Sequence, residues 1–218
     1  GEKPLFYGQH QGSVIFASEL KALRAIPGFN PDIDRQALAE YFRWTNVPSP
    51  MTIYEGVHKL PPAHYLRVSD RAGVSDPEPY WSVLDVAGSA SSLPDGVDAV
   101  DHLETVLDEA VHSQMISDVP LGAFLSGGLD SSSVVASMQR QSSDAVRTFT
   151  IGFSEASYDE SGYAAEVAAA LGTDHTDLVV SPDDAMRVIP DLPGVFDEPF
   201  ADSSQIPTYL VSQMARKH

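Results

Sequence analysis

The sequence predicts an α/β protein in two parts, a β-rich part over residues 1–86 and a parallel-sheet part over residues 97–218. Downstream of residue 97, apolar runs of strand length alternate with amphipathic helical segments, a rhythm typical of parallel sheets with right-handed crossovers. Upstream, short apolar runs are separated by Pro and Gly, which favours antiparallel strands and turns. Residues 87–96 between them are small and polar with a proline and a glycine, so we predict a linker there.

Short strands and small helices account for the first part. The predicted elements are strands over 4–7 and 13–18, helices over 19–26 and 35–44, and a hairpin formed by 63–69 and 74–83. Asp34 is the N-cap candidate of the second helix. Because this sheet would be an incomplete layer, we expect Phe6, Ile15 and Phe16 to lack apolar partners.

The second part opens with a long amphipathic segment in which apolar residues recur at helical spacing. The predicted elements are a helix over 97–115, a strand over 119–125, a helix over 131–141, a strand over 146–153, a helix over 159–171, a strand over 175–180, a helix over 182–196 and a final helix over 202–217. Ligands of such sheets bind at the carboxyl ends of the strands.

One glycine turn falls at such an end, between the apolar run 119–125 and the next helix. It reads Ser126-Gly127-Gly128-Leu129-Asp130-Ser131-Ser132. The first-turn N–H groups of a helix have no partner inside it and attract anions. The two glycines can adopt positive φ and let a phosphate approach, and the serines add hydroxyl donors. No lysine follows, so this is not a Walker-type P-loop.

Asp130 would repel phosphates unless a cation lay between them, and Mg²⁺ takes oxygen ligands from carboxylate and phosphate together. The stretch therefore predicts a phosphate site with Asp130 as a metal ligand. The alternative is an ordinary glycine turn in which Asp130 and Ser131 cap the helix.

Composition limits the functions that remain. The 218 residues include 31 acidic and 13 basic side chains, a formal charge of −18, which argues against a sequence-independent nucleic-acid surface and against binding to anionic membranes. No apolar run reaches transmembrane length. With no cysteine there is no disulfide, no thiolate metal site and no thiol nucleophile, so we assign no catalytic residue and expect a cytoplasmic protein.

Other polar residues have both a structural and a functional interpretation. The seven histidines lack metal-binding spacing, and we expect surface or structural roles for them. Asp159 and Glu160 could hold a second metal, but acidic residues at a helix start are the simpler account. Asp197, Glu198 and Asp202 lie near Ser203 and Ser204, where helix capping competes with substrate contact.

The run Ser126 to Ser131 resembles the pyrophosphate loop of ATP pyrophosphatases, and its flanks select one family. The sequence is similar to glutamine-hydrolysing asparagine synthetases in several segments that occur in the family's order. These are residues 3–7, 16–23, 55–65 and 80–81 in the first part, and residues 148–153, 158–160, 171–175 and 197–204 in the second.

This resemblance implies the end of a class II (Ntn-type) glutaminase region, then an adenine nucleotide α-hydrolase-like synthetase domain. Leu125 and Ile151 would line the adenosine pocket, Ser126, Gly127, Gly128, Leu129, Asp130, Ser131 and Ser132 would hold phosphates, and Asp130 would bind Mg²⁺. The implied reaction forms aspartyl-AMP from aspartate and ATP, with ammonia from glutamine displacing AMP. The resemblance also allows a homodimer.

The resemblance further implies that the chain begins after the family's nucleophilic cysteine and ends before its second nucleotide motif. We therefore expect the 218 residues alone to form no amide. Alternatives are a related amide-forming enzyme, such as a β-lactam synthetase or peptide cyclase, and a non-catalytic nucleotide-binding module. GMP synthetases and tRNA-thiolating enzymes share the loop, but residues 1–83 fit neither.

Overall fold

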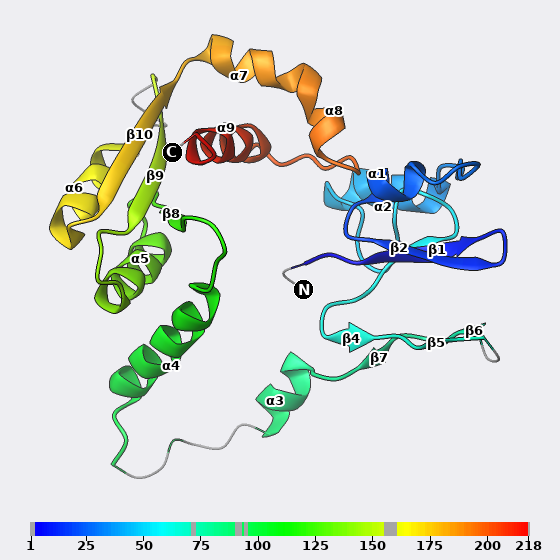
Figure 1. The fold of residues 1–218 in the computed structure, drawn as a ribbon, viewed down its shortest axis with the longest axis horizontal. Coiled ribbons are helices and arrows are strands. Elements are labelled where there is room, and N and C mark those ends of the chain that lie inside the picture. Colours follow the sequence, from blue (N-terminus) through cyan, green and yellow to red (C-terminus); the bar gives the residue numbers. More distant parts are fainter. Residues whose placement is uncertain (1–2, 71–72, 90–92, 94–95, 155–160, 218) are drawn as a thin grey trace. The chain divides into compact units, whose positions relative to one another are not determined.

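The computed structural model describes residues 3–70, 73–89, 93, 96–154 and 161–217, and its contacts divide the chain into two compact units. Unit 1 comprises residues 1–91 and 191–202, and unit 2 comprises residues 92–190 and 203–218. The expected α/β class is confirmed, with antiparallel strands in unit 1 and a parallel sheet in unit 2 (Figure 1).

Unit 1 contains a three-stranded antiparallel sheet of order β2-β1-β3. Its strands are β1 (Phe6–His10), β2 (Ser13–Ala17) and β3 (Val57–Lys59). Gln11 and Gly12, which join β1 to β2, have φ values of 49° and 77°, as a two-residue type I′ hairpin turn requires.

The apolar face of this sheet has partners, contrary to expectation. Phe6 and Ile15 are buried in one cluster with Leu20 and Leu23, whereas Phe16 is 71% exposed. The expectation was wrong for Phe6 and Ile15 because α1 (Leu20–Arg24) and α2 (Arg35–Trp44) supply buried residues to the same cluster.

Local signals predicted the helices of unit 1 well. The Asp34 carboxylate accepts hydrogen bonds from the N–H groups of Gln36 (2.8 Å) and Ala37 (3.1 Å), so the predicted N-cap of α2 is confirmed. α2 ends at Trp44, and the C-cap Thr45 has a positive φ of 62°.

The predicted hairpin is present in interrupted form. β4 (His64–Tyr65) pairs with β7 (Glu78–Pro79), and β5 (Val68–Ser69) pairs with β6 (Gly73–Val74). The chain then forms α3 (Val83–Ser89), which the sequence analysis missed because this segment was assigned partly to the hairpin and partly to the linker.

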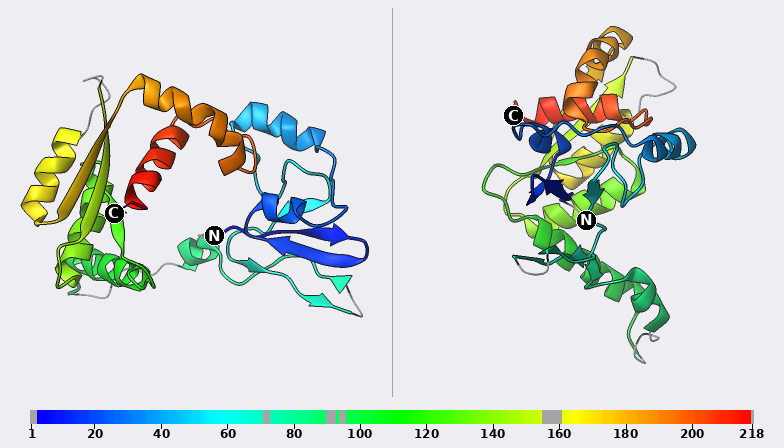
Figure 2. Two further views of the ribbon diagram at one scale, coloured as in Figure 1. Left: turned by 45° about the horizontal axis from the view of Figure 1, so that its top comes forward. Right: turned by 90° about the vertical axis from the view of Figure 1, so that its right-hand side faces the viewer.

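Unit 2 is a parallel sheet of order β10-β9-β8 with helices on both faces (Figures 1 and 2). In chain order its main elements are α4 (Ala99–Gln114), β8 (Gly122–Phe124), α5 (Leu129–Gln141), β9 (Arg147–Phe153), α6 (Ser161–Leu171), β10 (Asp174–Val180), α7 (Pro182–Val188) and α9 (Gln205–Ala215). Both views in which the sheet lies edge-on put α6 and α9 on opposite faces of it.

Two small clusters bury the faces of this sheet. Leu125, Val135, Ala164 and Ala168 pack together where α5 and α6 cover one face. On the other face, Phe149 packs with Val211 and Met214 of α9. β9 contributes Phe149 to the second cluster, and Ile151, two residues further along the strand, packs against the same cluster.

Several predicted elements differ in extent, and three of the differences have a bearing on unit 2. The strand predicted over 119–125 is shortened to β8, since Pro120 has no N–H to donate. The helix predicted over 182–196 is divided into α7, a 3₁₀ turn η1 (Ile189–Asp191) and α8 (Leu192–Val195), a break that coincides with Pro190 and Pro193. The final helix, α9, begins at Gln205 rather than at residue 202. In the part of the chain that the structure describes, no helix combines the length and apolar character needed to cross a membrane.

Candidate functional site

The glycine turn lies at the carboxyl end of β8, as predicted, and Gly127 is the residue that makes it possible. Gly127 has a φ of 76°, and a Cβ built on it would lie 2.8 Å from the backbone nitrogen of Ala164 in α6. Gly128 differs, because its φ is −70° and the nearest atom to a built Cβ is Ser126 Oγ at 3.3 Å. Of the two glycines that can adopt positive φ, Gly127 does so and Gly128 does not.

The N-terminus of α5 has no side-chain cap. Its N-cap residue is Gly128, which makes no side-chain cap hydrogen bond, and no side chain among the described residues is seen to accept from the N–H groups of the first turn. The interpretation in which Asp130 and Ser131 cap the helix is thus wrong, since both residues lie within the first turn and the N-cap position is Gly128. The N–H groups of Leu129, Asp130 and Ser131 have no partner inside the helix, which is the arrangement that binds anions.

Serine hydroxyls surround this helix start. Ser126 Oγ and Ser131 Oγ lie 2.9 Å apart, and the Ser126 N–H donates to Ser131 Oγ at 3.2 Å. Ser132 Oγ is buried and has no hydrogen-bond partner among the described residues. A buried hydroxyl without a partner is costly, so a bound oxygen-rich ligand would satisfy a group that the chain leaves open.

Asp130 carries an exposed carboxylate that forms no ion pair or hydrogen bond with the described residues. It is therefore free to act as an oxygen ligand. The described residues contain no group of three His, Asp or Glu side chains that could hold a metal ion. Asp159 and Glu160, the alternative metal ligands, lie outside the described residues.

A pocket of about 320 Å³ adjoins the turn in unit 2. This size is within the usual range of small-molecule sites, about 300–1,000 Å³. Its lining residues are Phe124, Leu125, Ser126, Ser131, Phe149, Thr150, Ile151, Pro207, Thr208 and Val211. Four of the predicted residues, Leu125, Ser126, Ser131 and Ile151, are thus brought together, while the other predicted residues of the turn do not line this pocket.

The sequence analysis missed the wall that α9 supplies. Pro207, Thr208 and Val211 lie more than 50 residues from the rest of the pocket, and nothing local in their sequence indicates a ligand site. Phe149 lies two residues before Ile151 on the same face of β9, so the alternation of that strand was a usable signal for it. Phe124 and Thr150 are sequence neighbours of predicted residues, but the alternation does not indicate them.

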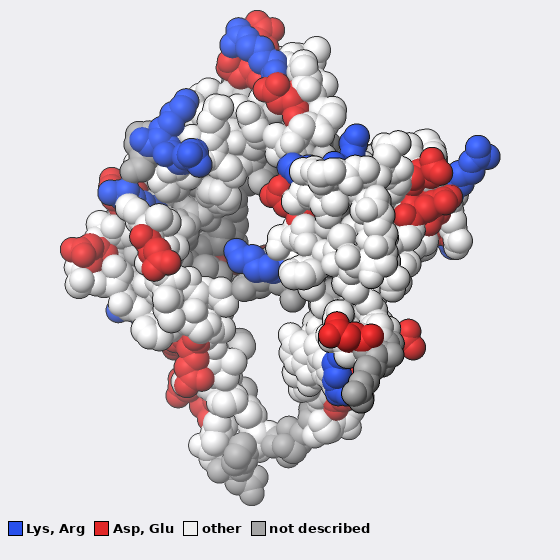
Figure 3. All heavy atoms as spheres, turned by 45° about the vertical axis from the view of Figure 1, so that its right-hand side comes forward, with Lys and Arg blue, Asp and Glu red and all other residues white. Residues whose placement is uncertain are grey.

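Charge does not gather into one continuous field on the visible surface. Figure 3 shows Lys and Arg beside Asp and Glu in small separate groups, despite the net charge of −18. A polyphosphate would therefore depend on the local donors of the turn and not on a broad basic surface.

The acidic group around Asp197 does not cap α9. The N-cap of α9 is Ser204, which forms no side-chain cap hydrogen bond. Asp197 and Glu198 instead bind residues of unit 1: the Leu20 N–H donates to Asp197 Oδ2 at 2.6 Å, and the Ile53 N–H donates to Glu198 Oε1 at 2.7 Å.

Comparison with known families identifies both parts of the chain. The asparagine synthase family model matches residues 102–218, which contain the glycine turn and its pocket. The chain belongs to the asparagine synthase family. A glutamine amidotransferase domain model matches residues 1–81.

Individual relatives agree with this family. Asparagine synthetase 1 (glutamine-hydrolyzing) of Bacillus subtilis strain 168 is 33% identical over 218 residues, which cover all of this chain and 33% of the relative. Asparagine synthetase 3 (glutamine-hydrolyzing) of the same strain is 31% identical over 218 residues, covering 90% of this chain and 34% of the relative. Amidase chry2 of Gibberella zeae is 33% identical over 190 residues, covering 80% of this chain and 27% of the relative. The chain thus spans about a third of the length of these curated relatives.

Proposed function

We propose that this chain carries the ATP-binding part of an enzyme that converts a carboxylate into an amide, with aspartate as the acid and glutamine-derived ammonia as the nitrogen source. The observation that carries the proposal is the start of α5 at the carboxyl end of a parallel sheet, where no described side chain caps the helix and Ser132 Oγ has no hydrogen-bond partner among the described residues. Membership of the asparagine synthase family supports the choice of reaction. The amidotransferase match over residues 1–81 supports glutamine as the donor.

The reaction has two steps whose atoms balance. A carboxylate oxygen of aspartate attacks the α-phosphorus of ATP, and pyrophosphate leaves with the electrons of the broken P–O bond. Ammonia then attacks the carbonyl carbon of aspartyl-AMP, AMP leaves, and the nitrogen loses a proton. In this proposal the N–H groups of residues 129–131 and Ser132 Oγ bind pyrophosphate oxygens as charge moves onto them, the role of an oxyanion site.

The apolar side of the pocket suits the nucleoside. Leu125 is almost fully buried and Ile151 lies two residues beyond Phe149 on the same face of β9, next to α9. We assign adenosine to this side and the phosphates to the Ser126–Ser132 turn. Such a division, apolar walls with few polar groups at one end, is common in nucleotide sites.

Asp130 fits a magnesium ligand, because its carboxylate is exposed and unpaired among the described residues. When bound, Mg²⁺ would neutralise phosphate charge beside the turn. We place this chemistry in the cytoplasm, where ATP is available. The homodimer stays a prediction, which sedimentation analysis can test.

Isothermal titration with MgATP tests the site. We expect the unchanged chain to bind and Asp130→Ala to lose about ten-fold in affinity, since a charge-assisted ligand is removed. Asp101→Ala is the matched control, because Asp101 is also an exposed aspartate in the first turn of a helix, α4. Equal affinity of Asp130→Ala and Asp101→Ala would refute the role of Asp130, and no binding by the unchanged chain would refute the proposed function.

The acceptor needs its own measurement, because a relative named as an amidase matches four fifths of the chain. Exchange of radiolabelled pyrophosphate into ATP reports the adenylation step alone. In the natural protein that contains this chain, we expect exchange that depends on aspartate and is absent with glutamate. Exchange that depends on another carboxylic acid would leave the assignment to an amide-forming enzyme intact, but it would show that aspartate is not the substrate acid.

A further inference from the structure

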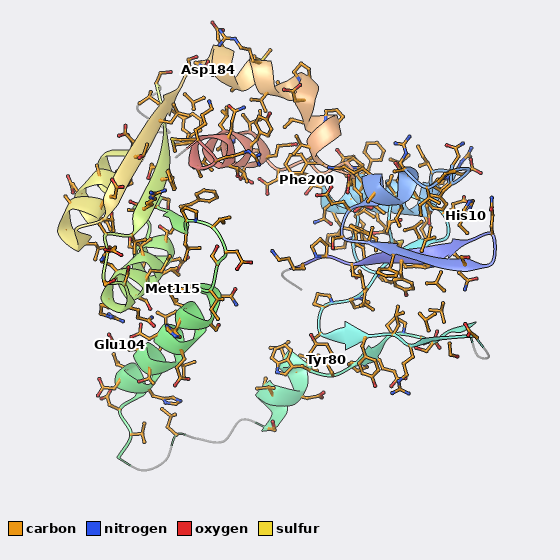
Figure 4. All side chains as sticks on the ribbon, in the orientation of Figure 1. His10, Tyr80, Glu104, Met115, Asp184 and Phe200 are labelled. Carbon is orange, nitrogen blue, oxygen red and sulfur yellow. The ribbon has the colours of Figure 1, made fainter. Side chains whose placement is uncertain are left out.

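Residues 191–202 belong to unit 1 although residues 92–190 of unit 2 precede them in the sequence. We call residues 191–202 the anchor segment. It contains α8 and the stretch Phe196–Phe200, in which the two aromatic rings pack edge to face with centroids 4.6 Å apart. Figure 4 shows Phe200 on the chain that leaves α8. The side-chain contacts that hold this segment in unit 1 join residues between 145 and 177 positions apart.

Asp197 of the anchor segment contacts two consecutive residues of α1. The Leu20 N–H donates to Asp197 Oδ2 at 2.6 Å, and Lys21 Nζ lies 3.4 Å from Asp197 Oδ1. Lys21 Nζ also donates to the Val195 carbonyl at 2.9 Å. Glu19, the N-cap residue of α1, forms no side-chain cap hydrogen bond, so the Leu20 N–H obtains its acceptor from the anchor segment.

Glu198 contacts a different part of unit 1 with both of its carboxylate oxygens. The Ile53 N–H donates to Glu198 Oε1 at 2.7 Å, and Lys59 Nζ lies 2.5 Å from Glu198 Oε2. Lys59 Nζ also donates to the Val47 carbonyl, which helps to fix the ammonium group in place. Each of the two adjacent carboxylates is thus bound by one backbone N–H and one lysine.

These charged groups are largely removed from water. The Asp197 and Glu198 side chains are 13% and 14% exposed, and the Lys59 side chain is 21% exposed. Charge pairs in such surroundings favour the correct partner, because a wrong one would leave a poorly solvated charge unpaired. Further along the segment, the Ala201 N–H donates to the Thr45 carbonyl at 2.7 Å, so the backbone is bound as well as the side chains.

The aromatic residues of the anchor segment border a hollow of about 350 Å³ within unit 1. Phe196 and Phe200 line this hollow together with Phe6 and Val47, which are buried members of the core cluster of unit 1. The anchor segment therefore presents aromatic rings beside core residues and carboxylates to lysines. Apolar contacts combined with a few polar pairs are typical of interfaces between separate molecules.

We propose that residues 1–91 carry a binding surface for an acidic, aromatic peptide segment, which residues 191–202 of the same chain occupy. The chemistry recognised is two adjacent carboxylates followed closely by an aromatic ring, as in Asp197-Glu198-Pro199-Phe200. The surface holds this segment by itself, so residues 1–91 stay bound to the rest of the chain when the covalent connection between residues 91 and 92 is cut. This binding does not depend on nucleotide, so its failure and the failure of the proposed function are separate outcomes.

Cutting the chain between its units tests the surface. A protease recognition sequence is inserted between residues 91 and 92, where unit 1 gives way to unit 2 in the sequence, and the folded chain is cleaved there. We expect the two pieces to stay together in size-exclusion chromatography at low micromolar concentration. In Asp197→Asn/Glu198→Gln the dissociation constant of the two pieces should rise at least about ten-fold, because neutral acceptors replace charged ones.

The matched control is Glu55→Gln/Asp85→Asn, which removes the same two charges from exposed residues of unit 1. We expect the dissociation constant of the control pieces to stay within about two-fold of that of the unchanged pieces, because exposed charges contribute little. Separation of the unchanged pieces would overturn the proposal. Equal dissociation constants for the anchor variant and the control would also overturn it.

Competition by a peptide uses the unchanged sequence and remains decisive if the anchor variant does not fold. Excess synthetic peptide of residues 191–202 should displace residues 92–218 from residues 1–91 after cleavage. The same peptide carrying Asp197→Asn/Glu198→Gln should require at least about ten-fold higher concentration for equal displacement. Displacement by neither peptide, or by both at the same concentration, would show that residues 1–91 do not recognise this acidic segment.

Discussion

The neighbouring helices α4 and α5 begin in opposite ways. At the start of α4, the Asp98 carboxylate accepts hydrogen bonds from the N–H groups of Val100 (2.8 Å) and Asp101 (3.2 Å). At the start of α5 the corresponding position is Gly128, which has no side chain to offer. The comparison teaches that a helix satisfied by its own cap is structural, while one left open at a sheet's carboxyl end is prepared for a ligand.

The carboxylates of the two helices differ in the same sense. Asp108 of α4 accepts hydrogen bonds from Ser137 and Arg140 of α5, and Glu104 pairs with Arg140 at 2.9 Å. Asp130, the acidic residue of α5, has no partner among the described residues. The carboxylates of α4 thus contribute to packing, whereas that of α5 is available for binding.

Gly127→Ala should produce the largest effect, because the open start of α5 depends on the backbone of Gly127. The new Cβ would lie within 3 Å of backbone atoms of Tyr163 and Ala164 and would adopt a φ of 76°. We expect a loss of about 3 kcal/mol in the free energy of unfolding, measured by denaturant titration.

Two glycines serve as controls for Gly127. Gly172 has a similar φ of 71° but open space around a built Cβ, so Gly172→Ala should cost only about 1 kcal/mol. Gly128→Ala, with a φ of −70°, should change stability little. Equal losses at Gly127 and Gly172 would mean that the close approach to α6 contributes nothing.

Gly128→Asn should convert α5 into a helix capped like α4. Its φ of −70° and ψ of 160° suit an N-cap, and asparagine adds no charge that would repel phosphate. We expect stability to rise by a few tenths of a kcal/mol and MgATP affinity to fall about ten-fold, because the side chain would occupy N–H groups that the phosphates need. If Gly128→Asn is more stable but binds MgATP with unchanged affinity, the open N-terminus of α5 is not needed for binding, and the contrast drawn between α4 and α5 fails.

The smallest expected effect concerns pH and the structural carboxylate of α4. Hydrogen bonds from Ser137 and then from Arg140 hold the pKa of the Asp108 carboxyl below its ordinary value. A folded pKa below the unfolded one stabilises the protein above the unfolded pKa, and this contribution is lost as the pH falls through the folded pKa. We expect the midpoint of denaturant-induced unfolding to fall as the pH is lowered from 5 to 3. This fall should be less steep for Asp108→Asn than for the unchanged chain. Asp101→Asn is the control, and an identical slope in Asp108→Asn and the unchanged chain would contradict this account.

Local chemistry allowed much of the fold to be predicted from the sequence. Asp34 is followed at once by a run with apolar residues on one side, so both the cap and α2 could be located. The apolar runs of β9 and β10 and the glycine turn before α5 were equally local signals. The start of α5 was placed two residues late. The N-cap residue is Gly128, and a glycine at this position lacks the polar side chain by which an N-cap is usually recognised in a sequence.

The remaining features depend on contacts between distant residues. Leu20 and Asp197 are 177 positions apart, and no local pattern indicates that one caps the helix of the other. The same holds for Thr208 and Val211 in the pocket wall. By contrast, the break between α7 and α8 could have been predicted, since Pro190 and Pro193 cannot donate the hydrogen bonds that a continuous helix needs.

Backbone amide chemical shifts during titration with MgATP test the central claim most directly, because they report on the individual N–H groups at the two helix starts. We predict large, saturable shifts for Leu129, Asp130 and Ser131 of α5 and none for Val100 and Asp101 of α4, whose N–H groups already donate to Asp98. Magnesium pyrophosphate should shift the same three amides. Saturable MgATP binding with no shift at residues 129–131 would contradict the claim that the open start of α5 holds the phosphates.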